Sequence, residues 1–213
     1  LTASGGGGSS HGDGIFVARH GERIDYQWRE RGDNWQSQAS RPWDTPLTAA
    51  GHKQGAALGR SIKRQCAELG LPPVRRVVSS PLLRCVQTAT EAARELGVEA
   101  VGIEAGAAET MCEEWYRSWA IPGADATWGG HAGSEMGTTS VAVADLHANA
   151  LGPASDCHRT VVELQELEGV NFAGGGPVEL DADFQSRAPR FEYQWGAFEA
   201  EEDACLRMKR VVE

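Results

Sequence analysis

A histidine between two arginines is the feature of this sequence most suited to chemistry. His20 lies between Arg19 and Arg23 and follows the apolar run Ile15–Ala18, which predicts a β-strand. A neutral imidazole is a nucleophile, and guanidinium groups beside it can hold the oxygens of a phosphate. In parallel α/β sheets ligands bind where strands end, which is where this segment would lie. The pattern therefore indicates half of a phosphate site, with His20 as nucleophile.

The elements expected to position His20 alternate between helices and strands. Thr48 is a candidate N-cap for a helix that runs to about Leu69, with apolar residues at helical spacing. A β-branched run at 74–79 predicts a second strand. Residues 82–96 then predict a helix that Gly97 ends, and residues 98–104 a third strand. This alternation is typical of an α/β fold with parallel strands.

The domain organisation follows from composition. Residues 1–13 are rich in glycine and serine and predict a flexible linker, so residues 14–213 are expected to form one domain. Residues 129–183 predict a long insertion within it, partly disordered or serving as a lid.

Local patterns predict one further loop and three further helices. Residues 25–41 are polar, contain tryptophans and predict an irregular loop. Helices are expected near 139–150 and 158–168. A last helix opens near Phe198 with acidic residues in its first turn, and it is still running at the end of the chain.

Composition excludes several classes of function. The formal net charge of −10 argues against a nucleic-acid-binding protein. No apolar run approaches the roughly 20 residues of a membrane span. The 5 cysteines are widely spaced, which favours reduced thiols over a disulfide framework or a zinc site. No signal peptide is visible, and we expect a cytoplasmic location.

Arg84 is a third candidate for holding a phosphate. It lies one turn into the predicted helix that follows the turn Ser79-Ser80-Pro81, so its side chain can point back to the strand ends. The N-terminus of that helix adds a favourable field for an anion. Cleavage of a phosphoester also needs a proton for the leaving oxygen, and a nearby carboxylic acid can supply it.

Three segments in this order resemble the histidine phosphatase superfamily, also called the phosphoglycerate mutase-like family. They are residues 19–23, residues 44–54 with Asp-Thr-Pro-Leu-Thr, Gly51 and Gln54, and residues 79–89. The pair Glu22-Arg23 and the run 84–89 resemble the branch that contains the phosphatase domains of ubiquitin-associated and SH3-containing proteins. The resemblance implies a three-layer α/β/α fold with a mostly parallel sheet.

The resemblance also implies roles for individual residues. His20 would be phosphorylated transiently, with Arg19, Arg23 and Arg84 as phosphate ligands. Thr48 and Gln54 are interpreted as cap and packing residues instead.

The resemblance further implies a general acid. Family members carry a Glu-Pro-Gly-Leu-x-Glu segment after the third strand, and residues 104–109 have this outline with alanine for the proline and the leucine. Glu109 is the resulting candidate, with Glu113 and Glu114 as alternatives.

A second histidine, which the family places in a Ser-His-Gly turn after a late apolar strand, has no match here. His131, His147 and His158 follow no apolar strand, and His52 is expected on a helix surface. The last helix resembles the one that precedes the missing C-terminal strand. We therefore expect a chain truncated before the second catalytic histidine, and inactive by itself.

The sequence thus predicts a phosphomonoester hydrolase that acts through phospho-His20 on a phosphorylated small molecule or phosphoprotein, without a metal or other cofactor. Two alternatives stay open. One is phosphotransfer of the phosphoglycerate mutase type, and the other is a catalytically inactive binding domain. Substrate identity and oligomeric state are not encoded in any motif that we identify.

Overall fold

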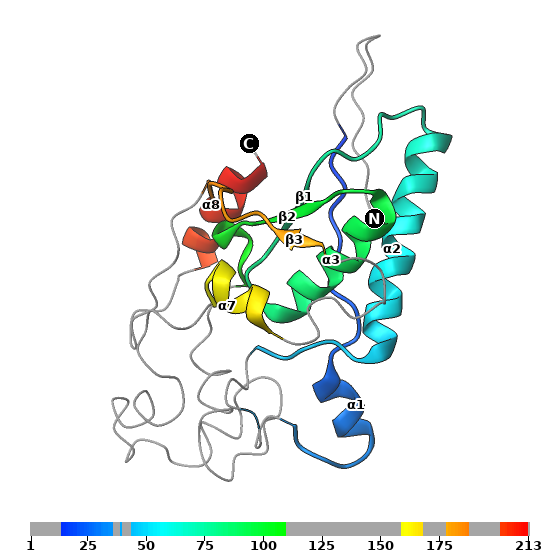
Figure 1. The fold of residues 1–213 in the computed structure, drawn as a ribbon. Coiled ribbons are helices and arrows are strands. Elements are labelled where there is room, and N and C mark those ends of the chain that lie inside the picture. The colour runs from blue at the N-terminus through cyan, green and yellow to red at the C-terminus, as the bar shows by residue number, and fades with distance from the viewer. Residues whose placement is uncertain are drawn as a thin grey trace.

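The computed structural model describes residues 14–35, 39, 44–109, 159–167, 178–187 and 201–212. Figure 1 labels the helices and strands, whose bounds in chain order are α1 (Ile24–Glu30), α2 (Ala49–Glu68), β1 (Val77–Ser79), α3 (Leu83–Leu96), β2 (Ala100–Ile103), α7 (Val161–Glu166), β3 (Glu179–Leu180) and α8 (Glu201–Val212). A 3₁₀ turn, η2 (Ala105–Ala107), follows β2.

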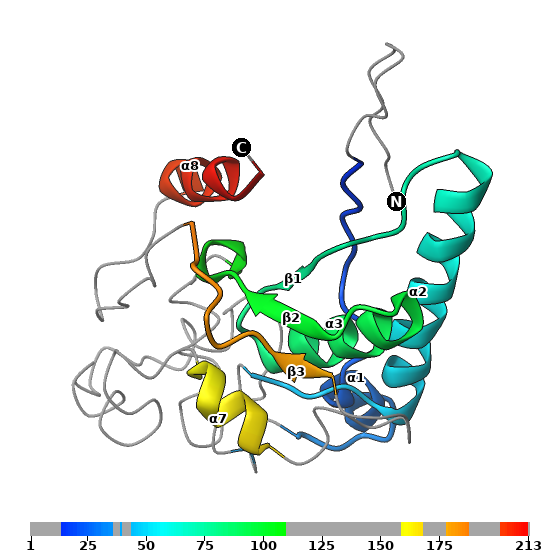
Figure 2. The same cartoon turned by 45° about the horizontal axis from the view of Figure 1, so that its top comes forward.

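The three strands form one parallel sheet in the order β1-β2-β3. Val77 pairs with Val101, and Val101 pairs with Leu180 on its other side. Figure 2 shows the strands side by side, with α7 next to β3 at one edge. Helix α3 connects β1 to β2 and packs against both strands. The predicted α/β class with parallel strands is confirmed, although β1 and β2 are shorter than the runs that predicted them.

The core lies between α3 and the sheet. An amphipathic face of α3 supplies part of it, and β2, α7, β3 and the residue before β3 supply the rest. Burial of such side chains contributes roughly 1.5–3 kcal/mol each relative to exposure. The cluster consists of Leu83, Val86, Ala93, Val101, Leu164, Val178 and Leu180.

Helix α3 begins and ends at defined signals. Gly97 at its C-terminus has a left-handed backbone (φ +77°), which glycine adopts without steric cost. Its N-cap residue, Leu82, offers no side-chain cap; instead the carboxylate of Asp44 accepts a hydrogen bond from the Leu83 N–H at 2.7 Å. The start of α3 is therefore fixed by a residue far back in the sequence.

Helices α2 and α3 approach closely because α2 presents glycines to α3. A Cβ on Gly59 would lie 2.6 Å from the Ala92 carbonyl oxygen, and one on Gly55 would lie 3.0 Å from the Glu91 Cβ. The expectation that His52 is a surface residue is wrong. His52 is buried, with Nδ1 3.0 Å from Oε1 of Glu91, because this approach places α3 over its face of α2.

The predicted strand Ile15–Ala18 is also wrong. These residues are not assigned to a strand, because the described part of the chain places no strand beside them to receive their backbone hydrogen bonds. Ile15 and Val17 remain largely exposed.

The irregular loop expected from residue 25 onward contains a helix at its start. Helix α1 is two turns long and carries Asp25 in its first turn, where an acid is favoured. Contacts to Arg23, described below, hold Asp25 and Tyr26 in place.

Parts of the stretch predicted as an insertion pack into the core. Leu164 of α7 is fully buried, and β3 pairs with β2. A capping box between Thr160 and Glu163 begins α7, which lies within the predicted helix 158–168. The helix expected near 139–150 lies outside the described residues.

The last helix is observed as α8. In the described part of the chain, no helix combines the length and the apolar character that a membrane crossing requires.

We expect Gly59→Ala to destabilise the protein, although alanine is the better helix former. Overpacking costs about 1–3 kcal/mol, and helix propensity returns up to about 1 kcal/mol. The free energy of unfolding, measured by urea denaturation, should therefore fall by about 1–2 kcal/mol when the overpacking cost lies in the middle of its range or above. The exposed Lys53→Ala serves as the control and should change it by less than about 0.5 kcal/mol. A more stable Gly59→Ala variant would contradict the packing described here.

Candidate active site

The turn that carries His20 is held between α2 and α3. The Gly21 N–H donates to Thr88 Oγ1 of α3 at 3.0 Å, and the Glu22 N–H donates to Gln54 Oε1 of α2 at 2.7 Å. Gly21 also lies directly on Gly51, since a Cβ on Gly21 would be 2.5 Å from the Gly51 carbonyl oxygen. The backbone after His20 is thus fixed from both sides.

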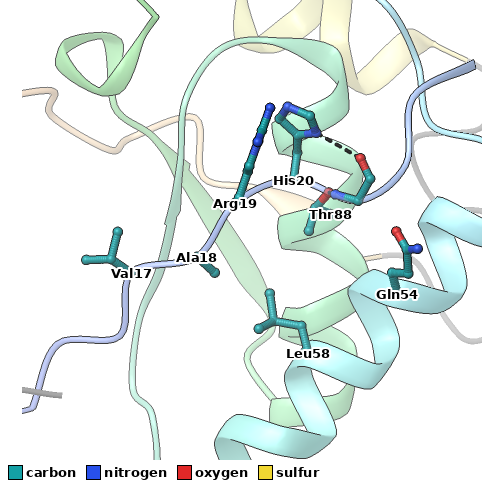
Figure 3. A pocket seen from close by; sticks show the side chains of 8 residues that line it. Val17, Ala18, Arg19, His20, Gln54, Leu58 and Thr88 are labelled. Atoms are coloured by element: carbon teal, nitrogen blue, oxygen red, sulfur yellow. Dashed lines mark hydrogen bonds between the residues drawn. The ribbon is translucent and has the colours of Figure 1, made fainter. Parts of the chain in front are cut away.

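One hydrogen bond defines the tautomer of His20. Its Nδ1 lies 2.8 Å from the carbonyl oxygen of Gly21, drawn as the dashed line in Figure 3. A carbonyl can only accept, so Nδ1 carries the proton and Nε2 keeps its lone pair. Nε2 is therefore the nitrogen able to act as a nucleophile.

The surroundings favour the neutral form of this imidazole. Burial lowers the pKa of His20 below its ordinary value of 6.5, and the positive charges of Arg84, Arg23 and Arg19 lower it further. The bond to Gly21 opposes this shift. The net direction is downward, which favours the neutral imidazole.

Arg84 connects the histidine to the predicted acid. It lies in the first turn of α3, is 3% exposed, and donates from Nη2 to Oε2 of Glu109 at 2.6 Å. The side chain of Glu109 is 47% exposed. Arg84 thus acts on His20 through its charge and holds Glu109 by contact. The alternatives Glu113 and Glu114 lie outside the described residues.

Arg23 is buried and forms a two-point ion pair with Asp25. Its Nε donates to Asp25 Oδ1 at 2.9 Å, and its Nη2 donates to Oδ2. The guanidinium also lies over the Tyr26 ring, 4.7 Å from the centroid. Sequence reasoning missed Asp25, although an acid two residues after an arginine was a visible signal. Arg19 is exposed, and Figure 3 shows its side chain next to that of His20.

The segment before α2 supports the same turn. Thr48 Oγ accepts from the Gly51 N–H at 3.0 Å, which confirms the predicted N-cap, and donates to Glu22 Oε2 at 2.5 Å. The Leu47 N–H donates to Gln87 Oε1 of α3 at 2.7 Å. Leu47 and Thr48 thus connect the His20 turn, α2 and α3 by hydrogen bonds.

Two buried charged residues hold the segment that carries Glu109. The carboxylate of Glu104 accepts from the Gly106 N–H at 2.8 Å. Arg207 of α8 donates to the Ala108 carbonyl at 2.9 Å and also to the Gly106 carbonyl. Sequence reasoning missed Arg207, because no motif surrounds it.

Cys85, next to Arg84, is not a competing nucleophile. Burial raises the pKa of its thiol, although the charge of Arg84 opposes the shift. The thiol form is poorly nucleophilic.

A pocket of about 260 Å³ lies beside the His20 turn, and Figure 3 shows it from close by. It is lined by Val17, Ala18, Arg19, His20, Gly21, Gln54, Leu58 and Thr88. Among the described residues no cluster of three histidine, cysteine or acidic side chains could hold a metal ion.

Comparison with known proteins decides the family. The profile of the histidine phosphatase superfamily (branch 1) matches residues 15–132, more than half of the chain. The chain belongs to this superfamily. Its matched region contains His20, Arg84 and Glu109.

A solved structure shares the fold of this chain. The ecdysone phosphate phosphatase of Bombyx mori, crystallised with tungstate, superposes with a TM-score of 0.51 at 17% sequence identity. The match covers 90% of this chain and 62% of the other, and at this identity it shows the fold alone. No curated protein sequence matches the chain significantly.

We expect the pKa of His20 to rise when a neighbouring positive charge is removed. Arg84→Met should raise it most, because Arg84 exerts the largest charge effect on the imidazole, and Arg19→Met should raise it least. Titration of the His20 imidazole by NMR measures these values. In the unsubstituted protein the pKa should lie below 6.5. An unchanged pKa in Arg84→Met would show that Arg84 does not act on His20.

Proposed function

We propose that this protein hydrolyses phosphomonoesters through a phosphohistidine on His20. The observation that carries the proposal is the bond from His20 Nδ1 to the Gly21 carbonyl, which leaves the Nε2 lone pair available. Three arginines act on the same imidazole. Such a group of cations attracts a phosphate dianion and stabilises charge that develops during its transfer.

The reaction has two steps. In the first, His20 Nε2 attacks phosphorus, the P–N bond forms and the bond to the leaving oxygen breaks, while Glu109 gives that oxygen a proton. In the second, Glu109 takes a proton from water, the water oxygen attacks phosphorus, and the P–N bond breaks to release phosphate. Arg19, Arg23 and Arg84 hold the nonbridging oxygens of the phosphoryl group, which move with phosphorus in both steps.

The contact between Arg84 and Glu109 suits this exchange of roles. In the free protein the carboxylate of Glu109 occupies one side of the Arg84 guanidinium. A phosphate bound at Arg84 competes with the carboxylate for this cation and repels its negative charge. The carboxyl group of Glu109 is then released from Arg84 for the proton exchange proposed above.

We further propose that the protein belongs to the branch that contains the phosphatase domains of ubiquitin-associated and SH3-containing proteins, and that it transfers the phosphoryl group to water and not to a second acceptor molecule. The pair Glu22-Arg23 supports this branch. The structural neighbour is named as a phosphatase, which also favours hydrolysis over mutase-type transfer.

Turnover by residues 1–213 should be slow. Within the described residues His52 is the histidine other than His20, and its Nδ1 is engaged with Glu91. It therefore gives the phosphate no second imidazole. If turnover were absent altogether, the chain would be an inactive binding domain that binds phosphate without forming a phosphoenzyme.

Phosphoenzyme trapping tests the proposed intermediate. After the chain is mixed with a labelled aryl phosphate and quenched, we expect an acid-labile, base-stable label that is absent from His20→Ala. His11→Ala is the matched control and should keep the label. Equal labelling of His20→Ala would refute the proposal, and transfer of the label to phosphoglycerate in place of water would indicate a mutase.

The role of Glu109 can be tested with substrates of different leaving groups. Glu109→Gln should slow cleavage of an alkyl phosphate by about 10²–10⁴-fold, because the alkoxide needs a proton to leave. The loss should be much smaller for nitrophenyl phosphate, whose leaving group is already stable as an anion. Glu113→Gln and Glu114→Gln are the controls. If one of them shows this dependence and Glu109→Gln does not, the acid is the alternative residue.

A further inference from the structure

We infer that Gln54 is a positioning residue that keeps His20 in its nucleophilic tautomer. The inference rests on the proposed role of His20 as the nucleophile. Gln54 has no hydrogen bond to the imidazole and acts through one peptide group between them.

The peptide group that joins Gly21 to Glu22 connects the two side chains. Its carbonyl oxygen accepts the proton of His20 Nδ1 at 2.8 Å, and its N–H donates to Gln54 Oε1 at 2.7 Å. A peptide group is planar, so an anchor on its N–H also fixes the direction of its carbonyl. An acceptor on the N–H also polarises the group and strengthens the carbonyl as an acceptor.

Gly21 makes this anchor necessary. Glycine restricts its own backbone less than other residues, so the Gly21–Glu22 peptide plane can rotate unless something holds it. The neighbouring anchors act on other groups: Thr88 accepts from the Gly21 N–H, and the Thr48 N–H donates to the Glu22 carbonyl. Among these three bonds, only the bond to Gln54 holds the peptide group that His20 contacts.

The chemistry of position 54 fits this role. The carboxamide oxygen accepts a hydrogen bond without adding a negative charge near the imidazole. A carboxylate at this position would also accept the bond, but it would favour the protonated imidazole and so raise the pKa of His20. Gln54 lies in the second turn of α2, on a helix that the Thr48 cap begins, and it lines the pocket beside His20 (Figure 3).

The test uses two substitutions and a matched control. Gln54→Met removes the acceptor while keeping the length of the side chain, and Gln54→Glu keeps an acceptor but adds charge. Ala57→Met places the same methionine on an exposed position of the same helix. The readout is the ¹⁵N spectrum of the His20 imidazole, assigned with His20→Ala, which distinguishes the protonated from the unprotonated nitrogen.

In the unsubstituted chain and in Ala57→Met, we expect the proton on Nδ1. Gln54→Met should give a mixture of tautomers, and Gln54→Glu should restore the Nδ1 proton with a raised pKa. The rate of phosphoenzyme formation should fall by about tenfold or more in Gln54→Met, and the KM should change much less, because Gln54 acts on the imidazole through the peptide group.

An unchanged tautomer in Gln54→Met would overturn the inference, and so would a mixture of equal size in Ala57→Met. The spectrum requires no substrate, so it stays decisive if no phosphoenzyme forms. In that case the proposed function fails while the effect of Gln54 on the imidazole is still measured. Thermal unfolding of each variant separates a local change from a loss of fold, and a lower Tm without a tautomer change counts against the inference.

Discussion

The turn after His20 lies directly on the first turn of α2, and the rest of the site depends on this contact. Gly21 and Gly51 approach so closely that a Cβ on either would overlap backbone atoms of the other segment. This approach brings consecutive backbone N–H groups within reach of Thr88 and Gln54. Side chains of α2 and α3 accept hydrogen bonds from both N–H groups, so the turn that carries the imidazole is held in place. Holding a reacting group in place lowers the entropic cost of reaching a reactive geometry.

Two of the arginines near His20 are paired with carboxylates that hold their side chains in place. Burial and three arginines favour the neutral form of His20, which is the form able to attack as a nucleophile. Asp25 fixes Arg23, and Glu109 contacts Arg84. Asp44 determines where α3 begins, and this start places Arg84 in the first helical turn. The arrangement therefore holds the positive charges in position before a phosphate binds. The carboxylate of Glu109 occupies part of the Arg84 guanidinium in this arrangement.

Local signals explain which elements could be predicted. Helices α2 and α3 have regular apolar spacing and end signals at Thr48 and Gly97 that act within one turn. The run Ile15–Ala18 has an equally good strand pattern, yet a strand exists only when a neighbour completes its hydrogen bonds. Helix α1 was missed because seven residues are too short for a periodic pattern to stand out, and its support comes from the contacts of Arg23.

The sequence by itself determined the candidate nucleophile His20, the arginines near it, the parallel α/β class and the membership of the histidine phosphatase superfamily. The tertiary structure alone decided how those groups are held. It brought Gln54 to the Glu22 N–H across 32 residues, Thr88 to Gly21 across 67, and Arg207 to Ala108 across 99. Periodicity and capping act over one or two helical turns, so no local pattern encodes hydrogen bonds that form only after distant segments have packed together.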